Sequence, residues 1–458
     1  MIAVRRAPAM PGAPGAAGPS ASRRRRQGLR TTADNRAMDP IPAPPPSESV
    51  RHPNWILAAV CLLGLMSTIG MAMPYPILAP IFVDGPVDAF THFGGLQPSV
   101  LMGMALAANP LGILIGSLFA GPLSDRHGRR LVLAVTLVAT LAGHLLTAAA
   151  LVARNYPLFA LARFATGLVE SNVAVARAML ADMHEQIDRT RAFALLNACM
   201  YAGWLLGPLV GGLTLPLGEP VPFVLAAAMT LPCVAVLFLG LPAAPAKGSG
   251  GDVGAALRER NVLALLRADR TLGLIFGLQL AYTLALNTLY EFSPLWMLQN
   301  AHFDSRGIAF VTAGQCGVMT LTSVLAGRFG GSGRHPLRRA ARFALIGAGG
   351  LSLMAVLPGR VGIFVIMAMG FPTAMYNAVM PAWMSERFAE HGQGRVMGLL
   401  STIFCVSNVV VALGGGWIAL LSTRWIMALG GVAAVASAVL MLRLARSEAG
   451  AAARAVAA

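Results

Sequence analysis

The sequence has little charge for its length. Charged residues make up 12% of the 458 residues, about half the proportion that is usual in soluble domains. Hydrophobic residues make up 56%, and they form long blocks rather than the one-sided stripes of soluble helices. A soluble chain of this composition would have too little polar surface to remain in solution, so we predict a membrane protein.

Signs of enzymatic chemistry are also missing. No cysteine or histidine pair has metal-ligand spacing, and no glycine-rich loop follows a strand. We therefore expect no enzyme, no cofactor and no metal site. The five cysteines all fall inside apolar blocks, where they act as small core residues and cannot build an extracellular disulfide framework; they are Cys61, Cys199, Cys233, Cys316 and Cys405.

The formal net charge of +16 does not indicate nucleic-acid binding, because of where the basic residues lie. Many are in residues 1–52, a stretch rich in arginine, proline and alanine that we expect to be disordered. A further hypothesis is that the native chain starts at Met38. The other basic residues lie mainly between the apolar blocks, as in membrane proteins.

Twelve apolar blocks are long enough to cross a membrane, which takes about 20 residues. They are 55–83, 99–121, 131–152, 157–181, 193–214, 221–241, 271–297, 307–327, 340–357, 361–385, 396–420 and 425–444. A polar linker, 242–270, separates the six-helix bundles 53–241 and 271–445, and 446–458 forms a C-terminal tail. We predict an all-α membrane protein in which the long, proline-containing first and seventh spans tilt or bend.

Arginine and lysine orient the chain, because they are enriched in cytoplasmic loops. With a cytoplasmic N-terminus, the outer loops receive only Arg154, Arg306, Arg360 and Arg424. We therefore expect both termini in the cytoplasm. We also expect the chain to be a monomer in the inner membrane of a bacterium.

The two bundles resemble each other at an offset of about 205 residues, a construction that is common in transporters. Ala120-Gly121 matches Ala326-Gly327, and Gly211-Gly212 matches Gly415-Gly416. Such matches predict two pseudo-symmetric halves.

The loop between spans two and three reads Gly121-Pro-Leu-Ser-Asp125-Arg126-His-Gly128-Arg129-Arg130. Gly128 permits a tight turn, and Asp125 can face a helix N-terminus. This segment resembles the loop motif of the major facilitator superfamily. The resemblance extends over about residues 54–445 and implies a charge relay that latches the cytoplasmic side. Its members would be Asp125, Arg126, Arg129 and Arg130 in the loop and Asp182 and Arg189 at the exit of span four. In the second half Gly331 replaces the aspartate.

Span five contains glycines and one proline at the positions Gly203, Gly207, Pro208, Gly211 and Gly212. The glycines allow another helix to approach, and the proline bends the span. A packing kink alone would explain this pattern. It also resembles the signature of antiporters in the superfamily, which favours export over import.

Span four carries Arg163, Glu170 and Arg177 at spacings of seven residues, on one helix face. Ionisable groups at membrane depth are expensive and usually functional. Burial favours a neutral Glu170 and the arginines favour a charged one, as a proton carrier requires. The alternative is a structural ion pair. Arg163 with Gly167 resembles the core of the superfamily's span-four motif. That motif usually has a small residue at the position of Glu170, so Glu170 is a departure from it.

Other polar residues in the spans are candidates for the substrate cavity. Glu291 in span seven could carry protons, bind a substrate amine or lie at the outer interface. The remaining candidates, given the family's cavity-lining spans, are Arg177, Tyr282, Asn287 and Tyr290, together with Tyr376 and Asn377 in span ten. We interpret His144 in span three as a packed histidine, with a proton relay as the alternative.

The function predicted from these features is proton-coupled efflux of amphiphilic small molecules by alternating access. The expected partners are a small-molecule substrate, protons and the lipid bilayer, and not nucleic acid. Two alternatives stay open. An importer of an organic anion would use Arg163 and Arg177, and a non-transporting membrane scaffold or sensor would move no substrate.

Overall fold

The computed structural model describes residues 53–170, 175, 189–240, 270–329, 335–388 and 393–457. Residues from 50 onward belong to one unit. The described residues are helical and contain no strand. The linker 242–270 and the tail 1–52 lie outside the described residues, apart from Arg270.

Seven helices in the described part belong to the first half: α1 (Pro53–Ala72), α2 (Pro74–Val83), α3 (Pro98–His127), α4 (Arg129–Val152), α5 (Tyr156–Val169), α7 (Arg189–Thr214) and α8 (Val221–Gly240). Seven described helices belong to the second half: α11 (Arg270–Ala301), α12 (Ser305–Phe329), α13 (Pro336–Val356), α14 (Gly359–Ala368), α15 (Gly370–Arg387), α16 (Gln393–Ile418) and α17 (Thr423–Ala457).

The predicted membrane fold is confirmed. Eleven helical segments of the described chain are long and apolar enough to cross a membrane. The shorter apolar helix α5 corresponds to span four, most of whose other residues lie outside the described ranges. One face of α4 shows the expected lipid-facing surface, because Leu131, Val135 and Val138 are each more than half exposed. In water such a row of large apolar side chains would be unfavourable.

Two of the predicted spans are each divided into two helices. Span one is split into α1 and α2, which meet at Met73 and Pro74. Pro74 and Pro76 lack the backbone N–H groups that a continuous helix would use. Span ten is split into α14 and α15 at Met369. Span seven differs, because α11 continues without a break through Pro294.

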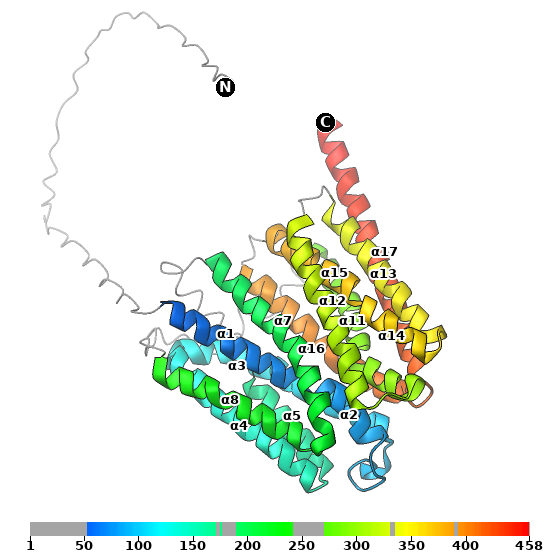
Figure 1. The fold of residues 1–458 in the computed structure, drawn as a ribbon. Helices are drawn as coiled ribbons and strands as arrows, with labels where there is room; N and C mark the ends of the chain where they lie inside the picture. Colours follow the sequence, from blue (N-terminus) through cyan, green and yellow to red (C-terminus); the bar gives the residue numbers. More distant parts are fainter. Residues whose placement is uncertain are drawn as a thin grey trace, which may run out of the picture. The chain divides into compact units, whose positions relative to one another are not determined.

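Helix packing follows the division into halves (Figure 1). In the first half α1 packs on α7 and α8, α3 packs on α5, and α4 packs on α5 and α8. In the second half α17 packs on α11 and α13, while α12 packs on α15. Contacts between the halves join α3 to α16, α7 to α12, and α2 to α11 and α12.

The hydrophobic cores of the halves merge at one end of the helices. There, residues of both halves, such as Phe82 and Phe159 with Phe292 and Trp296, form one buried cluster. At the opposite end each half has its own cluster, one around Leu133 and the other around Met384 and its neighbours. The shared end is the one that carries residues 84–97, which the distribution of basic residues predicts to be outside.

Candidate functional site: buried charges and the contact between the halves

The loop motif between α3 and α4 contains a turn that only glycine adopts easily. Gly128 has φ 88° and separates the two helices, in the region that side chains with a Cβ rarely adopt. Arg129 donates a hydrogen bond to Ser124 Oγ at 3.4 Å, and Arg130 donates to the carbonyl of Phe238 on α8 at 3.0 Å. Arg126 is exposed. The loop therefore ties α3, α4 and α8 together.

The structure does not describe the side chains of the other predicted members of the charge relay. Asp182 lies outside the described residues, as do the side chains of Asp125 and Arg189. Arg189 is the first residue of α7. The relay therefore stays a prediction.

The glycines of the span-five motif bring α7 close to two neighbours. A Cβ on Gly203, Gly207 or Gly211 would come within 3.0 Å of α1 or of Met73 at its end. A Cβ on Gly212 would collide with Ala309 of α12, in the other half. Pro208 lies inside α7 between these contacts. Side chains larger than hydrogen at these glycines would separate α7 from α1 and from the second half.

Glu170 is buried at the C-terminal end of α5, with only 2% of its surface exposed. Asn109 of α3 donates a hydrogen bond from Nδ2 to Glu170 Oε2 at 2.8 Å. His144 of α4 places Nε2 3.6 Å from the other oxygen, Oε1. Three helices of the first half therefore bring polar groups to one carboxyl group.

Arg163 lies two helical turns before Glu170 on α5 and is 3% exposed. It interacts electrostatically with Glu170 and with Tyr75 of α2. Its Nε and Nη1 atoms have no hydrogen-bond partner among the described residues. Arg177, the third charged residue of span four, lies outside the described residues. Arg163 is therefore the described cation that can balance an ionised Glu170.

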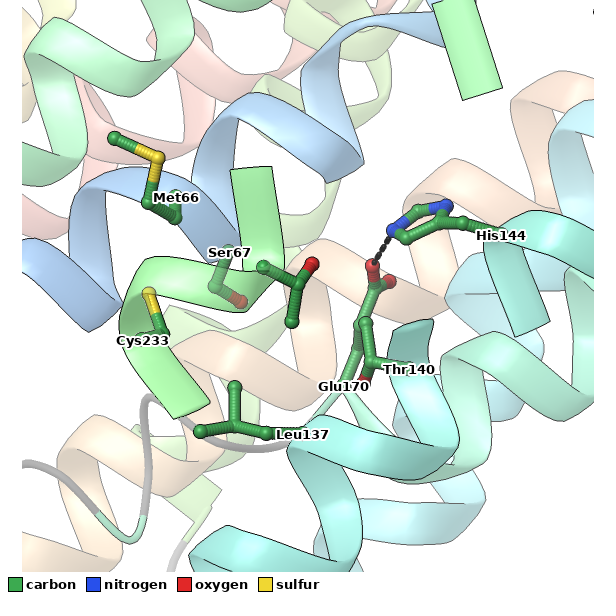
Figure 2. Close-up of a pocket in the computed structure, with 8 residues that line it drawn as sticks. Met66, Ser67, Leu137, Thr140, His144, Glu170 and Cys233 are labelled. Atoms are coloured by element: carbon green, nitrogen blue, oxygen red, sulfur yellow. Dashed lines mark ion pairs between the residues drawn. The ribbon is translucent and has the colours of Figure 1, made fainter. Parts of the chain in front are cut away.

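A narrow pocket opens beside Glu170 (Figure 2). Its walls come from α1, α4 and α8 and from the end of α5: Met66, Ser67, Leu137, Thr140, His144, Glu170, Thr230 and Cys233. Its interior is about the size that one water molecule requires. Figure 2 shows the carboxyl group of Glu170 facing the imidazole of His144 across one side of this pocket.

Four aromatic rings gather where the halves meet. Trp204 of α7 lies 5.7 Å from Tyr75 of α2, 5.6 Å from Tyr290 of α11 and 6.4 Å from Phe404 of α16, measured between ring centroids. The Tyr75 hydroxyl donates a hydrogen bond to Asn408 of α16 at 2.9 Å. All four rings keep partly exposed surface. We call these four residues the aromatic cluster; both halves contribute to it.

Glu291 follows Tyr290 on α11 and is 2% exposed. Neither of its carboxyl oxygens has a hydrogen-bond partner among the described residues. It interacts electrostatically with Tyr75, across the contact between the halves. Glu291 is thus a buried acid beside the aromatic cluster, and not an interfacial side chain that reaches toward lipid headgroups.

The other predicted cavity residues lie mainly within the second half. Tyr282 and Tyr376 are buried and stack on each other with centroids 3.3 Å apart. Asn287 donates a hydrogen bond to Ser407 of α16 at 2.6 Å. Asn377 is partly exposed on α15. Tyr290 is the predicted cavity residue that belongs to the aromatic cluster.

Sequence reasoning missed the residues that face Glu170 and two rings of the aromatic cluster. Asn109 did not appear among the candidates, and His144 was interpreted as a packed histidine; it is buried, but it faces Glu170. A polar residue inside an apolar block was the available signal for both. Trp204 and Phe404 were missed because aromatic residues are common in apolar blocks.

Comparison with known proteins agrees with this architecture. A family profile described as Major Facilitator Superfamily matches residues 55–361 and 275–457. The chain is similar to the class C tetracycline resistance protein of Escherichia coli, with 30% identity over 176 residues, which is 38% of this chain and 41% of that protein. That match therefore covers less than half of the relative's length.

A longer match is to the class G tetracycline resistance protein of Vibrio anguillarum, with 24% identity over 372 residues, 78% of this chain and 88% of that protein. The 4-hydroxybenzoate transporter PcaK of Acinetobacter baylyi is 29% identical over 162 residues, 34% of this chain and 31% of that protein. Among solved structures, a D-xylose–proton symporter superposes with a TM-score of 0.65 at 16% identity, covering 85% of this chain and 97% of that one. This likeness shows the fold.

Proposed function

Because the chain belongs to the Major Facilitator Superfamily, we propose that it is a secondary transporter that exports amphiphilic small molecules from the bacterial cytoplasm in exchange for protons. The observation that carries the proposal is Glu170, a carboxyl group buried in a membrane-spanning bundle and surrounded by polar groups. Transport would proceed by alternating access, in which the halves rock about a site between them.

The surroundings of Glu170 suit a group that gains and loses a proton. Removal from water favours the neutral acid, whereas Arg163 and the amide of Asn109 favour the carboxylate. The opposing influences allow a small rearrangement to change the protonation state. A structural ion pair needs no such balance, and it would place the carboxylate in direct contact with Arg163, with which Glu170 forms no described salt bridge.

The aromatic cluster supports a substrate site between the halves. Its rings come from α2, α7, α11 and α16, so a bound molecule would contact both halves and respond to their movement. Aromatic faces bind flat apolar molecules and attract cations. Glu291, whose carboxyl oxygens lack described partners, would bind the positively charged part of a substrate.

Three observations support export. The α7 motif has the antiporter pattern and packs against α1 and α12. Relatives include tetracycline resistance proteins and the quinolone resistance protein NorA of Staphylococcus aureus. The shared core closes the end that carries residues 84–97, so the site would be reached from the predicted cytoplasmic end. The latch on that end would be formed by Asp125, Asp182 and Arg189 when it closes.

The test uses the purified protein in proteoliposomes that contain a pH-sensitive dye. A proton gradient is imposed, and tetraphenylphosphonium, tetracycline, a quinolone and 4-hydroxybenzoate are added in separate experiments. We expect at least one amphiphile to drive proton movement in the wild type and none to do so in Glu170→Gln. If movement persists in the variant, Glu170 is not the proton carrier. If no compound moves protons in the wild type, proton-coupled efflux is wrong.

A second candidate function is import of an organic anion. Arg163 supports it, because two of its nitrogen atoms lack hydrogen-bond partners among the described residues and could bind a carboxylate. One relative is a 4-hydroxybenzoate transporter. Uptake of 4-hydroxybenzoate that follows the proton gradient, with no response to the cations, would favour this candidate over export.

A further inference from the structure

Three buried polar atoms without hydrogen-bond partners among the described residues belong to side chains that line one pocket. They are Ser67 Oγ on α1, His144 Nδ1 on α4 and Glu170 Oε1 at the end of α5. An unmade hydrogen bond at a buried atom costs about 1–3 kcal/mol. Ser67 and Glu170 each have one such atom beside this small space, whereas His144 turns Nε2, and not the unpartnered Nδ1, toward Glu170.

The other walls of this pocket do not supply the missing partners. Thr140 and Thr230 each donate their hydroxyl hydrogen to a carbonyl of their own helix, Thr136 O and Ala226 O. The remaining wall residues are Met66, Leu137 and Cys233. A buried water needs about two to four polar partners and a space about the size of this pocket.

We propose that this pocket binds one water molecule, which joins Ser67, His144 and Glu170 into the site that holds the transported proton. This inference rests on the proposed proton coupling and adds two residues to it. On loading, an O–H bond of hydronium breaks and a new O–H bond forms at Glu170 Oε1, which leaves a neutral water in the pocket. Release reverses the step, and the imidazole of His144 can share the proton because Nε2 lies 3.6 Å from Oε1.

The site belongs to the first half alone. Its walls come from α1, α4, α5 and α8, whereas the aromatic cluster includes residues of α11 and α16. The backbone of α1 covers the pair at Gly70, where a Cβ would lie 3.1 Å from His144 Nε2 and 3.8 Å from Glu170 Oε1. The proton and the substrate would therefore occupy different places.

Few other charged or titratable groups of the described chain face this site. Arg163 on α5 interacts with Glu170, and Tyr75 on α2 interacts with Arg163. Cys233 of α8 lines the pocket, and α3 contributes the neutral amide of Asn109. The described residues of α1 next to the pocket are uncharged. An ionised Glu170 therefore balances Arg163, and a protonated Glu170 leaves that cation uncompensated.

The inference can be tested without a substrate by infrared spectroscopy of the full-length protein in lipid films. The carboxyl band of Glu170 is identified by its loss in Glu170→Gln and is then followed from acid to alkaline pH. We expect the protonation midpoint of this band to move to higher pH by about one unit in His144→Gln, because the carboxylate loses a group that stabilises its ionised form. Ser67→Ala should cause a smaller shift in the same direction.

The control is Thr147→Val. Thr147 is buried on α4 one turn from His144, but its hydroxyl donates to the carbonyl of Gly143 and it does not line the pocket. The midpoint should stay unchanged in this variant. A water O–H band that shifts in heavy-oxygen water should be present in wild type and Thr147→Val, and absent in Ser67→Ala.

Three results would overturn the proposal: no pH-dependent Glu170 band, an unchanged midpoint in both His144→Gln and Ser67→Ala, or an equal shift in Thr147→Val. The outcome is separate from that of the proteoliposome experiment. Coupled titration without any substrate-driven proton movement would retain the water site and contradict the exchange function. Proton movement with an uncoupled Glu170 band would do the reverse.

Discussion

Glu170 in the first half and Glu291 in the second are both 2% exposed, yet their surroundings are opposite. Glu170 accepts a hydrogen bond from Asn109, lies near His144 and interacts with Arg163. Glu291 has no hydrogen-bond partner among the described residues and lies beside an aromatic cluster to which both halves contribute.

In the proposed exchange of protons for substrate, this difference would separate two tasks of the transporter. A site that holds a proton needs fixed partners, because they set how readily the carboxyl group ionises. A site that takes a substrate needs an acid whose partner arrives from outside. Neither carboxyl oxygen of Glu291 has a hydrogen-bond partner among the described residues, so a positively charged substrate would supply the charge that balances an ionised Glu291.

The largest effect that we expect on stability is from Glu170→Leu. The change removes the acceptor of the Asn109 amide and the carboxyl group that interacts with Arg163, and a buried hydrogen-bonding group left without its partner costs about 1–3 kcal/mol. The measurement is denaturant unfolding in mixed micelles. If the unfolding free energy fell by less than in an ordinary core substitution, the polar groups around Glu170 would contribute little to the stability of the first half.

The matching change in the second half, Glu291→Leu, should affect substrate binding more than stability. No described hydrogen bond is lost, so the unfolding free energy should stay within about 1 kcal/mol of the wild type or rise. Binding of tetraphenylphosphonium should weaken about tenfold, since a charged partner is removed. Fluorescence titration of Trp204, with the other tryptophans as a background, measures the binding. Strong destabilisation with unchanged binding would contradict our contrast between the two acids.

The two acids also illustrate which features the sequence alone can predict. The spans, the turn at Gly128 and a bend in the proline-containing first span depend on local chemistry: the length of apolar blocks, the freedom of glycine and the missing N–H of proline. Both Glu170 and Glu291 were found because an ionisable residue inside an apolar block is conspicuous.

The hydrogen-bond partner of Glu170 could not be found in the same way. Asn109 lies 61 residues before Glu170, and the contact depends on how α3 and α5 are rotated against each other. That rotation is set by tight helix contacts, such as Gly112 of α3 against the backbone of α5, where a Cβ would collide with Phe164 O. A hydrophobic pattern indicates which face is buried, but not which two polar atoms meet.

A third charged cluster lies outside the spans and provides a contrast with both buried acids. Arg154, after α4, donates hydrogen bonds to Asp88 in the loop after α2 and to Glu219 before α8. Burial acts to raise the pKa of Asp88, but hydrogen bonds from Arg154 and from the backbone N–H groups of Thr91 and Phe90 outweigh it and lower the pKa to about 2. Burial raises the pKa of Glu219, opposed by Arg154.

The smallest expected effect comes from Asp88→Asn, and it should depend on pH. A carboxyl group with a lowered pKa stabilises the fold above its unfolded value of 3.8, and this contribution disappears as the pH falls through about 2. The variant should therefore lose less than about 1 kcal/mol at neutral pH, because the pair is partly exposed, and should equal the wild type at the acid end. Thermal unfolding at low ionic strength over this range is the measurement.

Glu219→Gln is the control, because the pKa of Glu219 is raised and its effect on stability depends on pH in the opposite direction. Its contribution is present below pH 4.5 and is lost as the pH rises. If both variants lost stability equally at neutral pH, the cluster would act as a simple pair of salt bridges, and the difference between Asp88 and Glu219 would be wrong.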